Sequence, residues 1–455
     1  MKRIIFTVLA LVLSAPIASA KVPESEAQAL KNGTLTPLGA DKKANADGTI
    51  PAWDGGLKAA PAGWGGNGKR LVDPYADDKP LFTISAENLA QYKAKLTPGQ
   101  LALFARYPKT YRMPVYPTRR SVYNAPYIYD ATYQNALNSV LAEGSDAFQG
   151  GAMGVPFPLP KSGAEVIWNQ KLKHSGYSFR RWNSQLSVSA EGKFTETRLR
   201  EDNLAPYIEK GMTPARLNDL MAVYFLQVVK SPPRIAGTVN LALSPMDQKK
   251  SPQIVFQYNP GQKRVRRAPA VAYDAPDPGT DGLTTVDQID MFNGPLDRYS
   301  WKLVGKKELY IPYNSYQLHS DQLKYKDLVR PGHLNPEHAR YELHRVWVVE
   351  ATLKQGTSHA YARRTFYQEE DSWSLVLTDL YDARGQLWRA QEAHTVMYYD
   401  PADPHIITAG EVAYDLQSGR YALAAFSNEA DEFKHMSFPK NHFEQSNMEK
   451  AGGGG

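Results

Sequence analysis

Apolar and polar residues alternate with a period of two along much of the chain after residue 164. In residues 182–188 one face carries Trp182, Ser184, Leu186 and Val188. In residues 235–243 one face carries Ile235, Val239, Leu241 and Leu243. Because the side chains of a β-strand point to alternate faces of its sheet, both segments are predicted to be half-buried strands.

Long strands joined by short turns are predicted for residues 341–426. Turn signals recur roughly every 15 residues, wider than the spacing of about 8–12 residues that is typical of small sandwiches. They lie at Gln355-Gly356, Glu370-Asp371, Ala383-Arg384-Gly385, Asp400-Pro401 and Ser418-Gly419. This spacing predicts one continuous, strongly curved antiparallel sheet across residues 164–430.

Residues 254–272 form a predicted hairpin with one apolar face. Ile254, Phe256 and Tyr258 share that face, and Asn259-Pro260-Gly261 is a turn signal. The far side is basic, with Lys263, Arg264, Arg266 and Arg267. The apolar face is either ordinary core or the wall of a compartment for an apolar cargo, and the sequence leaves both open.

A period near 3.6 predicts a helix over residues 213–230. Thr213 with Pro214 opens it, and Pro232-Pro233 ends it. Its apolar stripe consists of Leu217, Leu220, Met221, Tyr224, Phe225 and Val228. We expect this stripe to lie against the concave side of the sheet, with Met221, Tyr224 and Phe225 inward.

Residues 21–160 have a different sequence pattern from the segment after residue 164, because Gly- and Pro-rich connectors separate short helical segments. Helices are expected after Ser85, after Thr97 with Pro98, and from Asp130 to Gly144. This part is interpreted as an N-terminal layer packed on the sheet.

The first 20 residues have the pattern of a secretory signal peptide. Lys2 and Arg3 precede an apolar run over residues 4–13, and a small-residue site follows at residues 18–20. The chain has no cysteine, so a lipid anchor on that residue is excluded. Removing two of the +6 formal charges leaves +4, which is modest for this length and argues against nucleic-acid binding. A periplasmic protein without a lipid anchor is therefore expected.

Common catalytic motifs are missing from the sequence, which has no G-x-S-x-G, H-E-x-x-H or P-loop pattern. His333, His338 and His344 do not have a metal-ligand spacing. Glu369, Glu370 and Asp371 lie at a predicted strand end, where we expect solvent to surround their charges. The protein is expected not to be an enzyme, and no cofactor or metal site is predicted.

Arg119-Arg120 form a second basic group. This group and the basic side of the hairpin are either solvated surface or a rim around an apolar cavity, suited to anionic head groups or an acidic partner.

Several long stretches resemble a known family of exported bacterial proteins. They are TLTPLGADKKANADGTIPAWDGG at 34–56, VDPYADDKPLFTISAENLAQY at 72–92, RMPVYPTRR at 112–120, GVPFPLPKSGAEVIWN at 154–169 and DLVRPGHLNPEHARYELHRVWVVEATLK at 327–354. On these stretches the chain is identified as a member of the family called domain of unknown function thirteen-twenty-nine. That family is grouped with the carriers that sort outer-membrane lipoproteins.

The resemblance implies an α+β fold with a large curved antiparallel sheet. This half-open β-barrel would be lipoprotein-carrier-like, with a helical lid and an elaborated N-terminal helix and loop layer. It also implies envelope transport beside an exporter of the resistance-nodulation-division type and an outer-membrane protein. The expected parts are the signal peptide at 1–20, the N-terminal layer at 21–160, the half-barrel domain at 161–433, and a tail at 434–455 that ends in a Gly-rich linker.

The leading hypothesis is a periplasmic carrier or adaptor for a lipid, an acylated protein or another hydrophobic cargo. The alternative is a ligand-free structural subunit of an envelope complex, and an enzyme acting on an amphiphile is disfavoured. The residues predicted to bind the cargo are Phe256, Tyr258, Met221, Tyr224, Phe225 and Trp347. The predicted basic rim consists of Arg264, Arg266 and Arg267.

Overall fold

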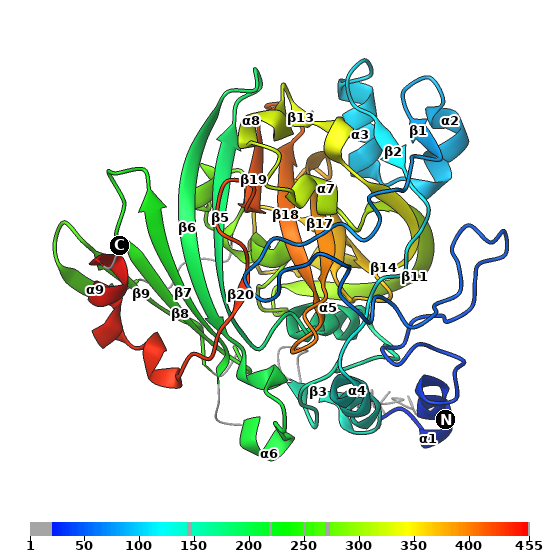
Figure 1. Ribbon diagram of the computed structural model, residues 1–455, viewed down its shortest axis with the longest axis horizontal. Coiled ribbons are helices and arrows are strands. Elements are labelled where there is room, and N and C mark those ends of the chain that lie inside the picture. Colours follow the sequence, from blue (N-terminus) through cyan, green and yellow to red (C-terminus); the bar gives the residue numbers. More distant parts are fainter. Residues whose placement is uncertain (1–20, 143–147, 218–220, 249–250, 269–273, 454–455) are drawn as a thin grey trace, which may run out of the picture.

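The computed structural model describes residues 21–142, 148–217, 221–248, 251–268 and 274–453. One open, strongly curved sheet dominates the fold (Figure 1). Its strand order is β1-β2-β14-β15-β16-β17-β18-β19-β5-β6-β7-β8-β9-β10, with β11 beside β14 and β20 beside β5. The predicted continuous curved sheet is confirmed. The predicted signal peptide lies outside the described residues.

The predicted meander is the centre of this sheet. Its strands pair antiparallel in sequence order, and all five predicted turns lie between them. The bounds are β14 Tyr341–Leu353, β15 Arg363–Glu369, β16 Leu375–Tyr381, β17 Leu387–Tyr398, β18 His405–Asp415 and β19 Tyr421–Phe426. Beyond β14 lie β11 Tyr299–Pro312, β2 Met113–Val115 and β1 Phe82–Ile84.

The remaining strands of the sheet form a second antiparallel meander, which we call the wing. Its strands are β5 Ser178–Val188, β6 Phe194–Leu204, β7 Met221–Ser231, β8 Val239–Pro245, β9 Ile254–Asn259 and β10 Arg264–Arg267. The wing joins the centre where β5 pairs with β19, and it projects at the left of Figure 1. The predicted hairpin is confirmed as β9 and β10, whereas the strand predicted from Ile235 begins at Val239.

The predicted lid helix over residues 213–230 is wrong. Among the described residues of this range only Pro214–Leu217 is helical (α6), and β7 begins at Met221; residues 218–220, which include the predicted Leu220, lie outside the described residues. Tyr224 pairs with Leu204 of β6 and Leu226 pairs with Leu241 of β8, so the apolar residues complete a sheet. Pairing with neighbouring strands outweighs the local helical spacing.

The other helices and short elements connect and cover the sheet. The α-helices are α1 Glu24–Ala27, α2 Leu89–Tyr92, α3 Pro98–Arg106, α4 Pro126–Asn138, α5 Gly163–Leu172, α7 Tyr316–His319, α8 Tyr325–Leu328 and α9 Gln445–Gly453. The 3-10 helices are η1 Gln28–Leu30, η2 Lys93–Lys95, η3 Pro206–Ile208, η4 Pro278–Thr280, η5 Val286–Met291, η6 Pro336–His338 and η7 Lys440–Phe443. The short strands are β3 Val140–Leu141, β4 Phe148–Gln149, β12 Val329–Arg330, β13 His333–Leu334 and β20 Lys434–His435.

The three helices predicted in the N-terminal layer exist with changed bounds. The first is short, as α2 and η2, and α3 begins with the predicted Thr97 cap. The third, α4, starts before Asp130 and ends at Asn138, where β3 follows, so the expected end at Gly144 was too late. None of the helices in the described ranges is long and apolar enough to cross a membrane.

Helices cover both faces of the sheet's centre. On one face α5 packs against β11 and β14, and Gly163 lies so close to Val349 that a Cβ would approach it to 2.9 Å. On the other face α3 packs against β16 and β17. The apolar residues around these helices form two large buried clusters. The sheet's centre is therefore the rigid core of the molecule.

Three carboxylates at the turn between β15 and β16 are buried beneath the N-terminal layer. Glu369, Glu370 and Asp371 are at most 3% exposed, so the expectation of a solvated strand end is wrong. Arg120 donates two hydrogen bonds to Asp371, at 2.7 and 2.8 Å. Because Arg120 is itself buried, it does not belong to a basic rim.

Further charges complete this network. Lys306 and Arg345 bind Glu370 at 2.7 and 3.1 Å. His344 lies between Glu342 and Glu369, at 3.1 and 3.4 Å. Burial opposes its positive charge, yet the hydrogen bonds to these two carboxylates raise the pKa of His344 to about 9. The network joins the N-terminal layer to β11, β14 and the turn after β15.

Replacing Arg120 with methionine is expected to lower the free energy of unfolding by about 3–5 kcal/mol, because it leaves Asp371 buried without its cation. Arg119→Met is the matched control, since the Arg119 side chain is 45% exposed and an exposed ion pair contributes at most about 1 kcal/mol. Denaturant titrations followed by tryptophan fluorescence measure both variants. Equal losses would contradict the special role given to Arg120.

Candidate functional site

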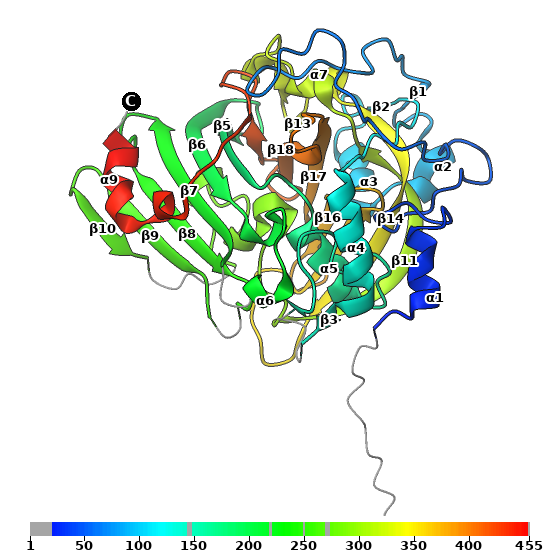
Figure 2. The same cartoon turned by 60° about the horizontal axis from the view of Figure 1, so that its bottom comes forward.

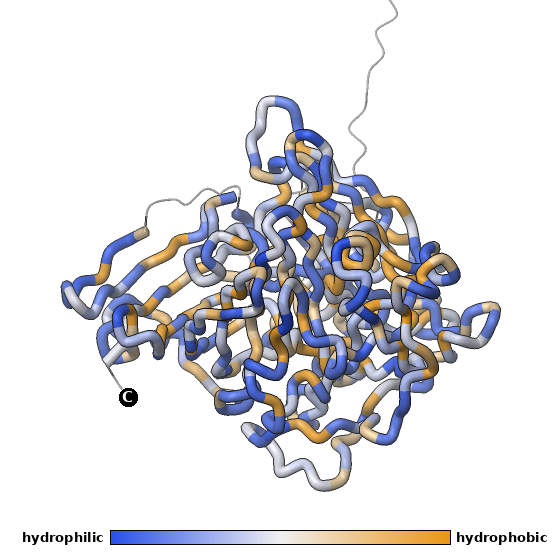
Figure 3. The backbone as a smooth tube through the Cα atoms, turned by 90° about the horizontal axis from the view of Figure 1, so that it is seen from above, coloured by the Kyte–Doolittle hydropathy of each residue, from blue (hydrophilic) through white to orange (hydrophobic). Residues whose placement is uncertain are grey.

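One face of the wing is a continuous apolar surface. Cross-strand partners lie on the same face of a sheet, and here apolar residues oppose one another across β7, β8 and β9. Leu241 pairs with Leu226 and with Phe256, while Val239 pairs with Val228 and with Tyr258. Figure 3 shows orange and blue stretches following one another along strands of the projecting wing.

The segment 434–453, which we call the cover, lies on this apolar face. It comprises β20, η7 and α9, and Figure 2 shows α9 across the wing strands. Phe443 and Met448 are its buried contacts, and the Phe443 ring lies 5.8 Å from that of Tyr224. The buried residues of the joint cluster are Leu204, Tyr224, Leu226, Val228, Val239, Leu241, Tyr258, Phe443 and Met448. The segment that the sequence assigns to a tail and linker thus packs on the sheet as far as Gly452, which lies against Gly237 and Val239.

An ionic contact fixes the cover beside the apolar cluster. Asp202 of β6 accepts hydrogen bonds from Arg180 and His442, at 2.8 and 2.9 Å. Burial acts to raise the pKa of Asp202, but these two partners outweigh it and hold the pKa below its usual value. The cover is therefore held by the pairing of β20 with β5, by a few apolar side chains and by one buried carboxylate.

The opposite face of the wing is polar. A row of side-chain hydrogen bonds crosses five strands there, with donor–acceptor distances of 2.9–3.3 Å. The row consists of Asn183, Glu201, Gln227, Asn240 and Gln257. Because one face is apolar and the other polar, the register of the wing strands is strongly specified.

The predicted cargo residues fall into three places. Met221, Tyr224, Phe256 and Tyr258 all belong to the apolar cluster under the cover. Phe225 alternates with Tyr224 and Leu226, so it lies on the opposite face. Trp347 belongs to the central core, where its ring stacks on Trp373 at 6.1 Å.

The predicted basic rim lies on β10, at the free edge of the sheet. Its three arginines are exposed. Arg267 pairs with Phe256 and therefore lies on the apolar face, whereas Arg266 pairs with Gln257 on the polar face. Arg264 is two residues from Arg266 and shares its face. Only Arg267 among the three is placed to meet a ligand on the apolar face.

The cover is the part of the site that the sequence did not predict. Phe443 and Met448 are separated by charged and polar residues in KNHFEQSNMEK, which matches neither a strand nor a regular amphipathic helix. Their partners, Tyr224 and Tyr258, lie far away in the sequence. No local signal could have identified this segment as a cover.

Comparison with known proteins places the chain in one family. Residues 83–449 match the profile described as "Protein of unknown function (DUF1329)". An uncharacterised protein of Pseudomonas aeruginosa is 47% identical over 422 residues, which are 93% of this chain and 92% of the relative.

Two solved structures also have similar folds. One is a domain of Vibrio parahaemolyticus named for outer-membrane lipoprotein sorting, with a TM-score of 0.44 and 14% identity over 64% of this chain and 98% of that one. The other is a DUF1329 family protein of Desulfovibrio piger, with a TM-score of 0.43 and 14% identity over 63% and 97%. The profile match and the Pseudomonas relative confirm the resemblance seen in the sequence: the chain belongs to the DUF1329 family.

Proposed function

We propose that this protein is a periplasmic carrier that shelters a lipid, an acylated protein or another hydrophobic cargo on the apolar face of the wing. The cover and the cargo compete for that face. The observation that carries the proposal is the way this face is buried: a segment that follows all the strands of the centre covers it, whereas helices inserted between strands cover the centre of the sheet. The signal-peptide pattern of the sequence supports the periplasmic location.

The cover has little stability of its own. Its helix α9 has the sequence QSNMEKAGG, in which Met448 is the one buried residue. A helix of this length is marginal in water. Packing on the wing therefore supplies most of the stability of α9, and a ligand that packs there equally well can replace it.

An acyl chain is a suitable competitor for the cover. Each CH₂ group that it buries is worth about 0.8 kcal/mol, so a chain of several carbons matches the few apolar side chains that the cover contributes. The resulting net affinity is moderate, because displacement of the cover offsets part of the gain. A carrier that must release its cargo to an acceptor requires such an intermediate affinity.

Charge at the edge of the wing suits an amphiphile. Arg267 lies beside Phe256 on the apolar face, and an anionic head group there would be attracted without being buried. The family resemblance extends the proposal to a resistance-nodulation-division type exporter and an outer-membrane protein as the donor and acceptor of the cargo.

A ligand-free structural subunit of an envelope complex is the second candidate. It is favoured by the closed apolar face, on which Phe443 and Met448 of the cover already pack; a pocket between α4 and α5 has a free volume of about 10 Å³. Such a volume holds one water molecule at most. In this conformation the wing can accept an acyl chain only if the cover moves.

Met448→Asp is expected to release the cover, because a carboxylate cannot remain buried at that position without a partner. An apolar fluorescent dye should then bind several-fold more strongly, while the near-ultraviolet circular dichroism of the centre stays unchanged. Ser446→Asp introduces the same group at an exposed position of the same helix and is expected to leave dye binding unchanged. An unchanged signal for both variants would contradict a detachable cover.

Phe256→Ala is expected to weaken the binding of a fluorescent fatty acid by about 10- to 100-fold, since a buried phenylalanine contributes about 1.5–3 kcal/mol of contact. Phe225→Ala removes the same ring from the opposite face and should leave the affinity within about twofold of the wild type. Fluorescence titration measures both. If the wild type binds no fatty acid, the structural-subunit candidate takes precedence.

Arg267→Gln is expected to weaken the binding of an anionic fatty acid by about two- to fivefold, because an exposed charge contributes less than about 1 kcal/mol. The effect should disappear in about 1 M salt, where charges are screened within about 3 Å. Arg266→Gln, on the polar face, should have no effect. A loss for both variants would show that the attraction comes from overall charge and not from a position beside the apolar face.

A further inference from the structure

A positively charged corner lies at the inner margin of the wing's apolar face, the margin nearest the centre of the sheet. Arg200 of β6 pairs with Trp182 of β5 and with Val228 of β7. Val228 in turn pairs with Val239, and both belong to the apolar cluster under the cover. Because cross-strand partners lie on the same face of a sheet, Arg200 continues a row of the apolar face.

Arg200 is buried with few partners. Its side chain is 11% exposed. Within the described ranges its one ion pair is with Asp202, at 3.7 Å, which is too long for a hydrogen bond. Its Nε is buried and has no hydrogen-bond partner in the same ranges. Buried charged groups are normally paired and hydrogen-bonded, so this guanidinium group is suited to bind a further group.

The carboxylate nearest to Arg200 is already neutralised. Asp202 accepts two hydrogen bonds from Arg180, at 2.5 and 2.8 Å. The two guanidinium groups of Arg180 and Arg200 thus share one carboxylate. Burial lowers the pKa of Arg200, Asp202 offsets only part of this effect, and the like charge of Arg180 adds to it. An anion beside Arg200 would correct this imbalance of charge.

The cover closes the charged corner with two stacked rings. Phe438 and His442 stack with their ring centroids 4.4 Å apart. His442 bonds to Asp202, and the Phe438 ring lies 5.3 Å from the Arg180 guanidinium group. Movement of the cover therefore opens the charged corner and the apolar row at the same time.

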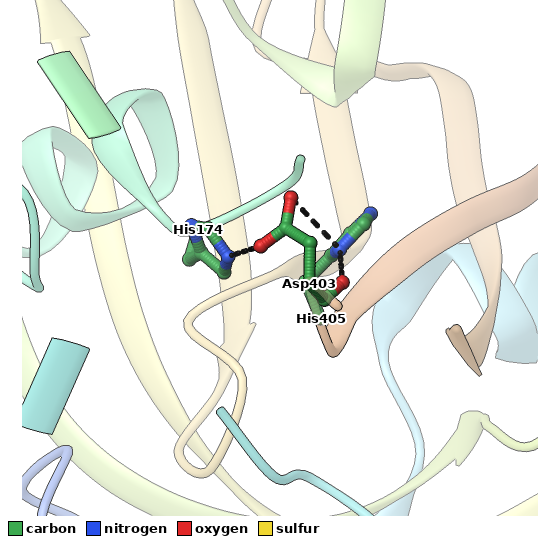
Figure 4. Close-up of side chains that lie close together, drawn as sticks. All are labelled: His174, Asp403 and His405. Carbon is green, nitrogen blue, oxygen red and sulfur yellow. Dashed lines mark hydrogen bonds and ion pairs between the residues drawn. The ribbon is translucent and has the colours of Figure 1, made fainter. Parts of the chain in front are cut away.

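The cluster around Asp403 does not provide a comparable site. Figure 4 shows Nε2 of His174 beside the Asp403 carboxylate, at 2.6 Å, and Nδ1 of His405 beside the carbonyl oxygen of Asp403, also at 2.6 Å. His435 of β20 approaches the same carboxylate at 3.9 Å. The nitrogens of His174 and His405 that face Asp403 are thus not free for another ligand.

We propose that Arg200 binds the anionic head group of an amphiphilic cargo, a carboxylate or a phosphate, at the inner margin of the apolar face. The hydrocarbon chain then lies along the row from Val228 through Val239 to Tyr258. Neighbouring strands are about 4.8 Å apart, so the distance from β6 to β10 is about 19 Å, which suits a long acyl chain. The proposal rests on the carrier function and specifies its ligand.

Arg200 and Arg267 have different roles in this arrangement. Arg267 is exposed at the free edge of the sheet, so it attracts an anion that remains in water. Arg200 is buried, so its attraction for an anion is screened little by salt. Arg267 therefore aids capture, whereas Arg200 holds the head group of the bound cargo.

The fluorescent fatty acid cis-parinaric acid and its neutral methyl ester test the head-group site. The two probes have the same chain, so the difference between their affinities depends on the head group alone. The full-length wild type should bind the ionised acid at least about tenfold more tightly than the ester. Arg200→Met should weaken the binding of the acid by about 10- to 100-fold and leave that of the ester within about twofold of the wild type.

Arg198→Met is the matched control. Arg198 lies on the same face of β6, but its side chain is 49% exposed and its Nε donates to Glu196 at 2.8 Å. This variant should keep the preference for the acid. Equal losses in both variants would overturn the proposal, because overall charge would then explain the preference.

The stability of Arg200→Met separates ligand binding from a structural role. Methionine removes the charge, and Asp202 keeps Arg180 as its partner, so the denaturant midpoint should be no lower than that of the wild type. A marked decrease would overturn the proposal, since it would show that Arg200 is paired within the folded protein.

The wild-type affinities separate this proposal from the carrier function. Equal affinity for the acid and the ester would overturn the head-group site and leave the carrier function standing. Binding of neither probe would contradict both.

Inorganic phosphate tests a second source of the same chemistry. Calorimetry should show no binding of millimolar phosphate alone, because a free anion has no chain with which to displace the cover. Phosphate binding that is lost in Arg200→Met would assign the site to a free anion and overturn the head-group proposal.

Brominated fatty acids test the orientation of the chain, because bromine quenches a nearby tryptophan. Trp182 pairs with Arg200, and the difference between the wild type and Trp182→Phe isolates its fluorescence. A fatty acid brominated beside its carboxyl group should quench Trp182 more strongly than one brominated at the far end of its chain. The reverse order would place the head group at the free edge and overturn the assignment to Arg200.

Discussion

The ion pair between Arg120 and Asp371 is the contact on which the arrangement of the rest depends. A turn between two strands is normally solvated, yet the turn after β15 is buried under the N-terminal layer. Arg120 also donates to the carbonyl oxygen of Asp41, and Trp373 of the same turn donates to the carbonyl of Leu38 at 2.8 Å. The N-terminal layer thus supplies both the cation and the backbone acceptors that make burial of the turn possible.

The centre of the sheet, which contains this contact, and the wing differ in the number of contacts that hold them. The centre of the sheet has helices on both faces and a charge network at one end, so its local unfolding requires the loss of many contacts. The wing has one apolar face, one polar face and a cover with few contacts. Local opening is therefore easiest at the wing, which is the part that the proposed function requires to open.

The sequence was sufficient where local pattern and tertiary structure agree. The turn signals between residues 341 and 426 lie between real strands, because long strands with polar turns have few alternative pairings. The stretch MAVYFLQVVK fits two periods at once, since its apolar residues satisfy both a helix and a strand. Leu204 and Leu241, in neighbouring strands, decide the outcome, and no local pattern contains that information.

The same reason explains which parts of the site were predicted. Four of the six predicted cargo residues belong to the cluster under the cover. Strand alternation correctly placed Phe256 and Tyr258 on one face. Tyr224 and Met221 were predicted from a helical period, although they belong to the strand β7. Burial of Asp371 could not be predicted, because its partner Arg120 is 251 positions away. The cluster around Asp403 likewise requires residues from three segments. The local pattern of apolar and polar residues contains no information about polar contacts between distant parts of the sequence.

The order of the wing and its cover along the chain has a consequence for folding. Among the described residues, strands β6 to β10 of the wing pair only with their neighbours in sequence, so this part of the meander can form early during synthesis. The cover follows only after the whole of β11–β19. Until the cover has been synthesised, the wing exposes its apolar face and an unpaired strand edge. Such features are recognised by chaperones and promote aggregation. During synthesis the chain therefore exposes, until the cover has been made, the surface that the folded protein keeps closed.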